Sequence, residues 1–207
     1  MSDEFTNQPW LQNLTYNVGL LGSFRNAQSQ LQFILNQANL NENAKIIDLG
    51  SGYAPFLYHC RQKGFNNLYA LEPSKEICHY LEGQGIVTYP ILLETFITQD
   101  DLPQFDLIVL SQILENLIEP ADILCGLRRL LSENGVLFIE VPYGENHNPH
   151  SRSLHLHFFN ETSMAHLLTR CGYRTMLIHP MRHNFLEVAL IKTLRLIHGE
   201  TYFKKRT

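Results

Sequence analysis

Short apolar runs alternate with stretches of helical periodicity along most of this chain of 207 residues. A short apolar run between turn residues is typical of a buried strand, and apolar positions repeated every three or four residues are typical of a helix. The runs that predict strands are residues 45–49, 67–71, 86–89, 105–110 and 135–141. The stretches that predict helices are residues 54–63, 75–84, 120–132 and 163–170. Strands and helices in alternation predict a mostly parallel sheet with helices on both faces.

Capping residues support these boundaries. Gly64, Gly85 and Gly172 follow three of the predicted helices, and glycine commonly ends a helix because it adopts the left-handed conformation without strain. Ser74 precedes another predicted helix as an N-cap. Ser23 in the same way predicts a helix over residues 23–37 near the start of the chain.

Two last strands are expected at residues 174–179 and 187–196. The connection between them is too short for a crossover helix, so the two are predicted to pair antiparallel. Together with the five earlier strands they predict a mostly parallel seven-stranded sheet whose final strand is antiparallel. The sequence shows no internal repeat and no linker that would divide the chain.

Length and composition indicate one soluble globular domain. The chain is 44% hydrophobic and 17% charged, which is ordinary for such a domain. A single domain over residues 1–207 is expected, with an N-terminal helical segment at 1–44, a core at 45–196 and a tail at 197–207. The net charge of −4 gives no reason to expect nucleic-acid binding.

The cysteines and the N-terminus indicate a cytoplasmic setting. The four cysteines are scattered and form no C-x-x-C pair, so they predict neither a zinc ribbon nor a thioredoxin-type motif. The first residues are acidic, where a signal peptide would be basic, and no apolar segment follows. No run approaches the length of a membrane span.

The most informative motif follows the first predicted strand. Asp48 lies two residues before Gly50, Gly52 completes a G-x-G turn, and Glu72 stands twenty positions later at the end of the second predicted strand. Glycine tolerates the positive φ of a tight strand-to-helix turn and lets a ligand approach the backbone closely. A carboxylate at the next strand end can accept hydrogen bonds from ribose hydroxyls. The motif therefore predicts a nucleoside ligand.

This motif resembles D-x-G-x-G-x-G of the class I S-adenosylmethionine (SAM)-dependent methyltransferases, with Ala54 in place of the third glycine. The resemblance implies a three-layer αβα Rossmann-like sandwich and SAM as cofactor. It implies that Gly50, Ser51 and Gly52 cradle the methionine part of SAM and that Glu72 binds its ribose. It also implies that Asp48 orders the turn or reaches the amino group through water.

Two other interpretations of the motif stay open. A nicotinamide or flavin site has the pattern G-x-G-x-x-G/A, which from Gly50 requires glycine or alanine at the position of Pro55. Such sites also do not usually carry an acid at the position of Asp48. The second alternative is a tight strand-to-helix turn that binds no ligand.

A second block, FDLIVLSQILENLIEP, resembles the FDhhhhxxVLEHhxDP segment of many small-molecule methyltransferases, and Asn116 replaces the common histidine. The resemblance implies that Ser111, Gln112 and Ile113 border the sulfur and methyl group of SAM. Glu115 and Asn116 are expected to be structural, at the start of the next helix. The stretch that matches the family's adenine contacts is Leu93, Glu94 and Thr95.

Further matches extend the resemblance over residues 45–196. Glu140-Val141-Pro142-Tyr143 resembles the family's E-V-P-N strand end, and residues 155–164 resemble its H-L-x-[FY]-F block. This subset suggests a small-molecule acceptor, such as a sugar, a lipid-like compound or another metabolite. No N-P-P-Y motif follows the fourth predicted strand, which disfavours amide or exocyclic-amine targets.

Four histidines lie close together, at His147, His150, His155 and His157. Clustered histidines can bind a metal, but the spacing is not a regular i, i+4 pair, and no metal is expected. A neutral histidine can instead take a proton from the attacking acceptor. His155 leads as this base because it matches the recurring family histidine, with His157 and Tyr143 next. The third possibility is that His155 only orders its loop.

Two other classes of protein remain possible at this point. One is a catalytically inactive SAM-binding partner or regulatory protein, which the altered third glycine and Asn116 would permit. The other is an NAD(P)-dependent oxidoreductase. Neither the acceptor atom nor the oligomeric state is indicated by the sequence.

Overall fold

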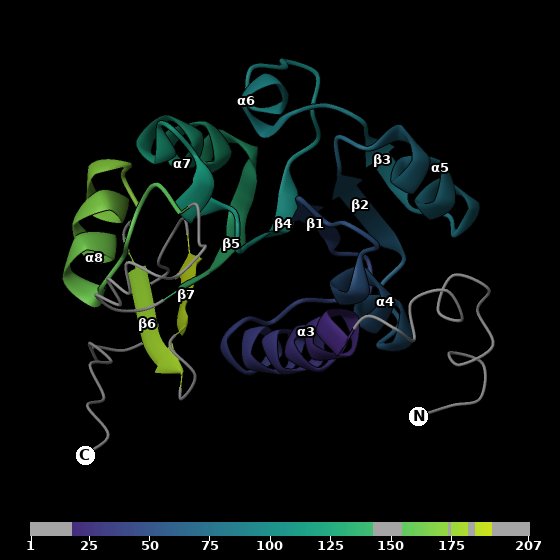
Figure 1. Ribbon diagram of the computed structural model, residues 1–207, viewed down its shortest axis with the longest axis horizontal. Coiled ribbons are helices and arrows are strands. Elements are labelled where there is room, and N and C mark those ends of the chain that lie inside the picture. The colour runs from purple at the N-terminus through teal and green to yellow at the C-terminus, as the bar shows by residue number, and fades with distance from the viewer. Residues whose placement is uncertain (1–17, 143–154, 174, 182–184, 192–207) are drawn as a thin grey trace. The chain divides into compact units, whose positions relative to one another are not determined.

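The computed structural model describes residues 18–142, 155–173, 175–181 and 185–191 (Figure 1). Contacts within the chain divide it into two compact units, with the boundary between Phe96 and Ile97. Each unit is described by itself. Within the described ranges, no helix is long and apolar enough to cross a membrane.

Over residues 18–96, the first unit has three strands and four helices. Its elements are α3 (Val18–Gln37), β1 (Lys45–Leu49), α4 (Pro55–Gln62), β2 (Asn67–Leu71), α5 (Lys75–Gly83), β3 (Val87–Tyr89) and α6 (Leu93–Phe96). The strands lie in the order β3-β2-β1, and both pairs are parallel. Asp48 is opposite Ala70 and Leu49 is opposite Leu71. Parallel strands in this register bring the residues after β1 and after β2 to the same edge.

The apolar runs of the first unit form its core because both faces of the strands are covered. Ile46 and Ile47 are fully buried in β1, and Ile34 of α3 is equally buried. Helix α3 packs against α4 (Figure 1). The prediction that Ser23 caps this first helix is wrong, because α3 begins at Val18 and Ser23 lies within it. Two glycines in the first turns do not end the helix, since an interior glycine costs only about 1 kcal/mol.

The described part of the second unit has four strands. Its elements are β4 (Phe105–Ser111), the 3-10 turn η1 (Leu114–Asn116), α7 (Pro120–Leu130), β5 (Leu131–Pro142), α8 (Glu161–Arg170), β6 (Thr175–Met181) and β7 (Phe185–Ile191). The strands lie in the order β4-β5-β7-β6. β4 and β5 are parallel, whereas β7 is antiparallel to both β5 and β6. The carboxyl ends of β4 and β5 meet at Ser111 and Glu140.

The chain turns tightly at the start of β5. Helix α7 ends at Leu130, two residues earlier than predicted, and β5 begins at once with Leu131 opposite Phe105. The register then shifts, so that Val136 is opposite Leu107. A Cβ on Gly135 would lie 2.8 Å from the carbonyl oxygen of Phe105 and 2.9 Å from the backbone nitrogen of Ser132. Only glycine fits this position without a backbone shift.

Replacing Gly135 with alanine is expected to lower the free energy of unfolding by about 1–3 kcal/mol, because the new methyl group would press on backbone atoms that cannot rotate away. Gly83→Ala is the matched control. Gly83 ends α5 with nothing within 4 Å of an added Cβ. There, alanine is expected to stabilise the helix by about 0.5–1 kcal/mol. Urea unfolding of both variants checks the prediction, and equal stabilities would contradict it.

Candidate active site

The turn after β1 is held in a left-handed conformation by the end of β2. Gly50 has φ 69°, Gly52 has φ 51° and Ala54 has φ 52°. The backbone N–H groups of Gly50 and Ser51 both donate to the carbonyl oxygen of Leu71, at 2.8 and 3.1 Å. Ala54 therefore adopts the conformation that glycine would adopt at the third position of the motif, and the altered residue does not change the course of the backbone.

Glu72 ties this turn to the start of α5. One carboxylate oxygen accepts the Gly52 N–H at 3.0 Å and the other accepts the Ser74 N–H at 2.9 Å. Glu72 is partly exposed, and a carboxylate offers about four lone-pair sites, so further hydroxyl donors can bind beside the two N–H groups. A Cβ placed on Gly52 would meet nothing within 4 Å, which leaves open space beside the turn. The residues present fit a ribose next to a closely approached backbone.

The same hydrogen bonds bear on the nature of the ligand. The N–H groups of Gly50, Ser51 and Gly52 are used within the unit, and the Ala54 N–H donates to the Ser51 carbonyl at 2.8 Å. Helix α4 begins with Pro55, which has no N–H. A pyrophosphate is bound at such turns mainly by free backbone N–H groups. The turn is therefore better suited to hydroxyl and ammonium donors than to a dinucleotide phosphate.

Asp48 is buried beneath the turn. It is 6% exposed at the end of β1, and burial raises the pKa of its carboxyl group from 3.8 to about 7. Cys60 lies in helix α4, where its burial and then the negative charge of Asp48 raise the pKa of its thiol. A carboxyl that ionises near neutral pH responds strongly to a cationic ligand, because a nearby positive charge favours the ionised form.

The stretch that matched the adenine contacts forms the short helix α6. Leu93 is 7% exposed, so its side chain is buried within the first unit. Glu94 and Thr95 lie on the exposed side of the same turn. Of the three candidates, Glu94 and Thr95 are thus the two that a ligand can reach through exposed side-chain atoms.

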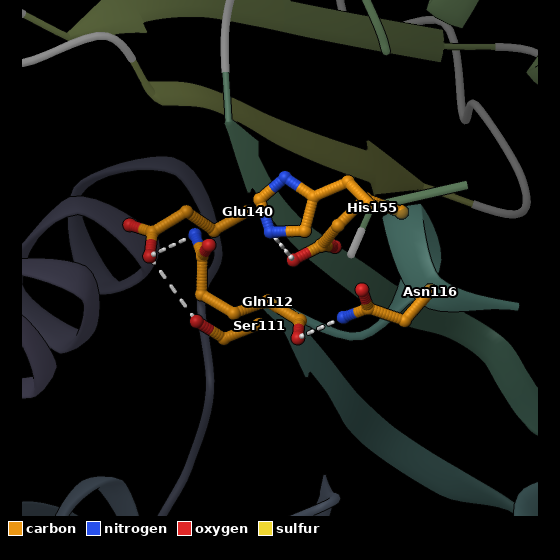
Figure 2. Close-up of polar contacts among 6 residues, drawn as sticks. Ser111, Gln112, Asn116, Glu140 and His155 are labelled. Atoms are coloured by element: carbon orange, nitrogen blue, oxygen red, sulfur yellow. Dashed lines mark hydrogen bonds and ion pairs between the residues drawn. The ribbon is translucent and has the colours of Figure 1, made fainter. Parts of the chain in front are cut away.

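In the second unit, Glu140 of β5 organises the end of β4 (Figure 2). One carboxylate oxygen accepts hydrogen bonds from the Ser111 hydroxyl and the Gln112 side-chain amide, both at 3.2 Å. The Gln112 backbone N–H donates to the Glu140 carbonyl at 2.8 Å, and Gln112 has φ 58°. A non-glycine residue in this conformation is strained, and such strain concentrates at functional sites. Glu140 was not among the sequence candidates, although a carboxylate inside an apolar run is a signal.

A second carboxylate, that of Glu115, lies in η1 beside a histidine. Glu115 is 1% exposed, and its Oε1 is 3.9 Å from Nε2 of His155. Its backbone carbonyl accepts the N–H groups of Leu156 and His157 at 2.8 and 3.0 Å. Burial, and then the charge of Glu140, raise the pKa of the Glu115 carboxyl. Glu115 was expected to start the next helix; it lies instead in the 3-10 turn before α7.

The other catalytic candidates differ in what surrounds them. The Nε2–H of His157 donates to the Leu117 carbonyl at 2.9 Å, which orders the segment. The side chain of His155 is 26% exposed and can be reached by a ligand. Tyr143, His147 and His150 lie outside the described residues. In the part of the chain that the structure describes, no three histidine, cysteine or acidic residues are grouped as a metal site would require.

Solved structures with the same fold are numerous. A possible histamine N-methyltransferase from Thermotoga maritima, described as SAM-dependent, has a TM-score of 0.63 and 14% identity, over 87% of this chain and 98% of that one. A putative methyltransferase from Haloferax volcanii, solved with the Trm112 activator, has a TM-score of 0.69 and 13% identity, over 87% of this chain and 96% of that one.

A third similar structure contains ligands. It is the 1,6-didemethyltoxoflavin-N1-methyltransferase of Burkholderia thailandensis with its substrate and S-adenosylhomocysteine, with a TM-score of 0.62 and 17% identity over 92% of this chain and 81% of that one. At these identities the likeness shows the fold. A search of curated proteins gave no match.

The fold and the motif together define the class of protein. It is an α/β Rossmann-like, SAM-dependent methyltransferase, with SAM as its cofactor. The family model described as a methyltransferase domain matches residues 23–177, and the chain belongs to that family.

Proposed function

We propose that this enzyme transfers the methyl group of SAM to a small-molecule acceptor, a sugar, a lipid-like compound or another metabolite. The main support for SAM as the methyl donor is the pair of hydrogen bonds from Gly52 and Ser74 to Glu72, which holds a carboxylate beside open space.

A small-molecule acceptor is supported by the Burkholderia structure, which holds a small-molecule substrate. Enzymes that methylate amino groups of nucleic acids and proteins often carry N-P-P-Y after the fourth strand. This chain has Ser111-Gln112-Ile113-Leu114 there, which weighs against amide or exocyclic-amine acceptors.

The SAM contacts that the resemblance implies are proposed here for each unit by itself. In the first unit, Gly50, Ser51 and Gly52 take the methionine part, Asp48 orders the turn or reaches the amino group through water, and Glu72 takes the ribose. Glu94 and Thr95 are proposed for the adenine. In the second unit, Ser111 and Gln112 are proposed to border the sulfur and the methyl group, since Glu140 fixes both side chains.

His155 is proposed as the base that takes the acceptor's proton, because its ring is partly exposed and lies next to a buried carboxylate. The hydrogen bond of the His157 ring to Leu117 favours an ordering role for His157. SAM supplies an activated methyl group when bound. The chain's own residues then position the acceptor, exclude water and hold the proton that the acceptor loses.

We also propose that residues 1–207 form one methyltransferase domain with a single seven-stranded sheet. The support is that the matched family model extends from residue 23 to residue 177 and so crosses the boundary between the two units. One cooperative unfolding transition, seen equally by calorimetry and by fluorescence, is expected for a single domain. Two separate transitions would contradict it.

Calorimetry with SAM, S-adenosylhomocysteine and NAD(H) tests the cofactor assignment. Micromolar affinity for the first two and none for NAD(H) is the expected result. Turnover is then measured on a panel of sugars, lipid precursors and heterocyclic metabolites, with S-adenosylhomocysteine as the detected product. Binding without turnover on any acceptor would favour the alternative of a SAM-binding regulatory protein, and binding of NAD(H) alone would overturn the proposal.

Gly52→Ala tests the open space beside the turn. Alanine already adopts the same φ at Ala54, so the expected loss of stability is only about 1–2 kcal/mol. The methyl group would, however, enter the space proposed for SAM, and affinity is expected to fall by at least roughly tenfold, which is about 1.4 kcal/mol. Gly64→Ala is the matched control, since Gly64 has φ 92° and also has nothing within 4 Å of an added Cβ. Equal SAM affinity in both variants would contradict the assignment.

A further inference from the structure

Two features of Glu115 are not explained by packing alone. Its side chain is 1% exposed, yet its Oε2 is a buried oxygen with no hydrogen-bond partner among the described residues. A buried carboxylate in this state is costly and requires an explanation. The group that its other oxygen approaches is the ring of His155, at 3.9 Å from Nε2.

The backbone of Glu115 fixes the histidine as well. Its carbonyl accepts the N–H groups of both Leu156 and His157, the two residues that follow His155. The 3-10 turn that carries Glu115 thus anchors the segment while its carboxylate lies beside the ring. The Phe158 ring makes an edge contact with the His155 ring, with centroids 6.4 Å apart. Backbone and side chain together limit how the imidazole can turn.

The position of the carboxylate distinguishes the two ring nitrogens. A carboxylate next to one nitrogen of a neutral imidazole favours the proton on that nitrogen and leaves the lone pair on the other. Here the carboxylate approaches Nε2, so its position favours the proton on Nε2 and the lone pair on Nδ1. The negative charge of Glu140 in β5 also acts on Glu115 and adds to the negative potential there.

We propose that Glu115 is a positioning residue: its buried carboxylate holds the neutral ring of His155 with the proton on Nε2, so that Nδ1 takes the acceptor's proton during methyl transfer. This rests on the proposed role of His155. In the step, the acceptor's nucleophilic atom bonds to the methyl carbon, and the carbon–sulfur bond breaks with its electron pair left on sulfur. The acceptor's proton passes to Nδ1, and the resulting imidazolium is stabilised by Glu115.

Nitrogen NMR of the ¹⁵N-labelled full chain tests the tautomer directly. The ring signals are assigned by their loss in His155→Gln. In the neutral ring, Nδ1 is expected to show the shift of a bare, pyridine-like nitrogen and Nε2 that of a protonated one. The reverse pattern would overturn the proposal. This measurement uses the unaltered protein, so it decides the matter even if a variant at Glu115 fails to fold.

Glu115→Gln tests whether the carboxylate is what sets the tautomer of His155. Without the carboxylate, the preference for the proton on Nε2 is expected to weaken, so the ¹⁵N shifts of Nδ1 and Nε2 should move toward each other. Glu119→Gln is the matched control: the same change, four residues away, at an exposed side chain. The control is expected to leave both ring shifts nearly unchanged. Equal ring shifts in wild type and Glu115→Gln would overturn the proposal.

Binding and turnover separate this inference from the proposed function. Glu115→Gln is expected to bind SAM as the wild type does and, once an acceptor is found, to lose at least roughly tenfold in kcat with KM unchanged. Full turnover in Glu115→Gln, with the wild type active, would overturn the inference alone. If wild-type protein does not bind SAM, the proposed function fails whatever the tautomer.

Discussion

Replacing Glu72 with alanine is expected to weaken SAM binding by roughly 10- to 100-fold, because hydrogen bonds to a charged group contribute about 1.5–3 kcal/mol. The carboxylate has two tasks at this position. It is proposed to accept the ribose hydroxyls, and it already accepts the N–H groups of Gly52 and Ser74. The variant therefore loses both a ligand contact and part of the support of the turn. Calorimetric titration with SAM measures the combined effect of these two losses on affinity.

Two further variants separate these tasks. Glu72→Gln keeps one acceptor oxygen and is expected to lie between wild type and alanine in SAM affinity. Glu76→Ala removes an exposed carboxylate in the first turn of α5 and is expected to change affinity less than about twofold, since a surface charge contributes little. Thermal unfolding of the ligand-free variants measures separately how much stability the turn loses without the Glu72 carboxylate. Unchanged SAM affinity in Glu72→Ala would remove the ribose assignment.

Asp48→Asn is expected to make the ligand-free protein more stable at pH 8, by up to about 4 kcal/mol. Burial raises the pKa of Asp48 from 3.8 to about 7, a shift of about 3 units, and each unit corresponds to about 1.36 kcal/mol. The sign follows from linkage: the unfolded chain ionises at lower pH than the fold does. The stability contributed by the protonated carboxyl is fully present below pH 3.8 and is lost as the pH rises through about 7.

Urea unfolding of wild type and Asp48→Asn at pH 4, 6 and 8 measures this difference. It is expected to be small at pH 4 and largest at pH 8. Asp101→Asn changes an exposed aspartate and is expected to follow the wild type at every pH. SAM affinity should move the other way and fall in Asp48→Asn, because an amide cannot balance the ammonium group of the ligand. A stability difference independent of pH would contradict the buried-charge explanation.

Most helices and strands could be predicted because their signals are local. β1 and β2 have the predicted bounds, since each is a short, mostly apolar run between turn residues. Ser74 accepts the Ile77 N–H as the predicted N-cap of α5. The start of α3 was missed because Ser23 suggested an N-cap, whereas the helix extends back to Val18.

The residues of the candidate site could likewise be predicted only where the signal is local. Glu72 was found from its spacing to Gly52, because β1 and β2 are neighbours whose ends lie at one edge. The contacts of Glu140 with Ser111, and of Glu115 with His155, join residues about thirty to forty positions apart. Periodicity contains no information about such pairs. The first contact depends on the register of β4 and β5, and the second depends on where the chain returns after β5. Both are properties of the tertiary fold.

The hydrogen bonds between the turn after β1 and the end of β2 have a consequence for binding entropy. Because Leu71 and Glu72 already hold the N–H groups of residues 50–52, the turn acquires its shape when the unit folds. A ligand that arrives there has no loop to order, and the conformational entropy lost on binding is correspondingly small. Ligand-free and SAM-bound crystals should therefore superpose closely over residues 48–54, and backbone order parameters measured there by NMR should barely change on binding.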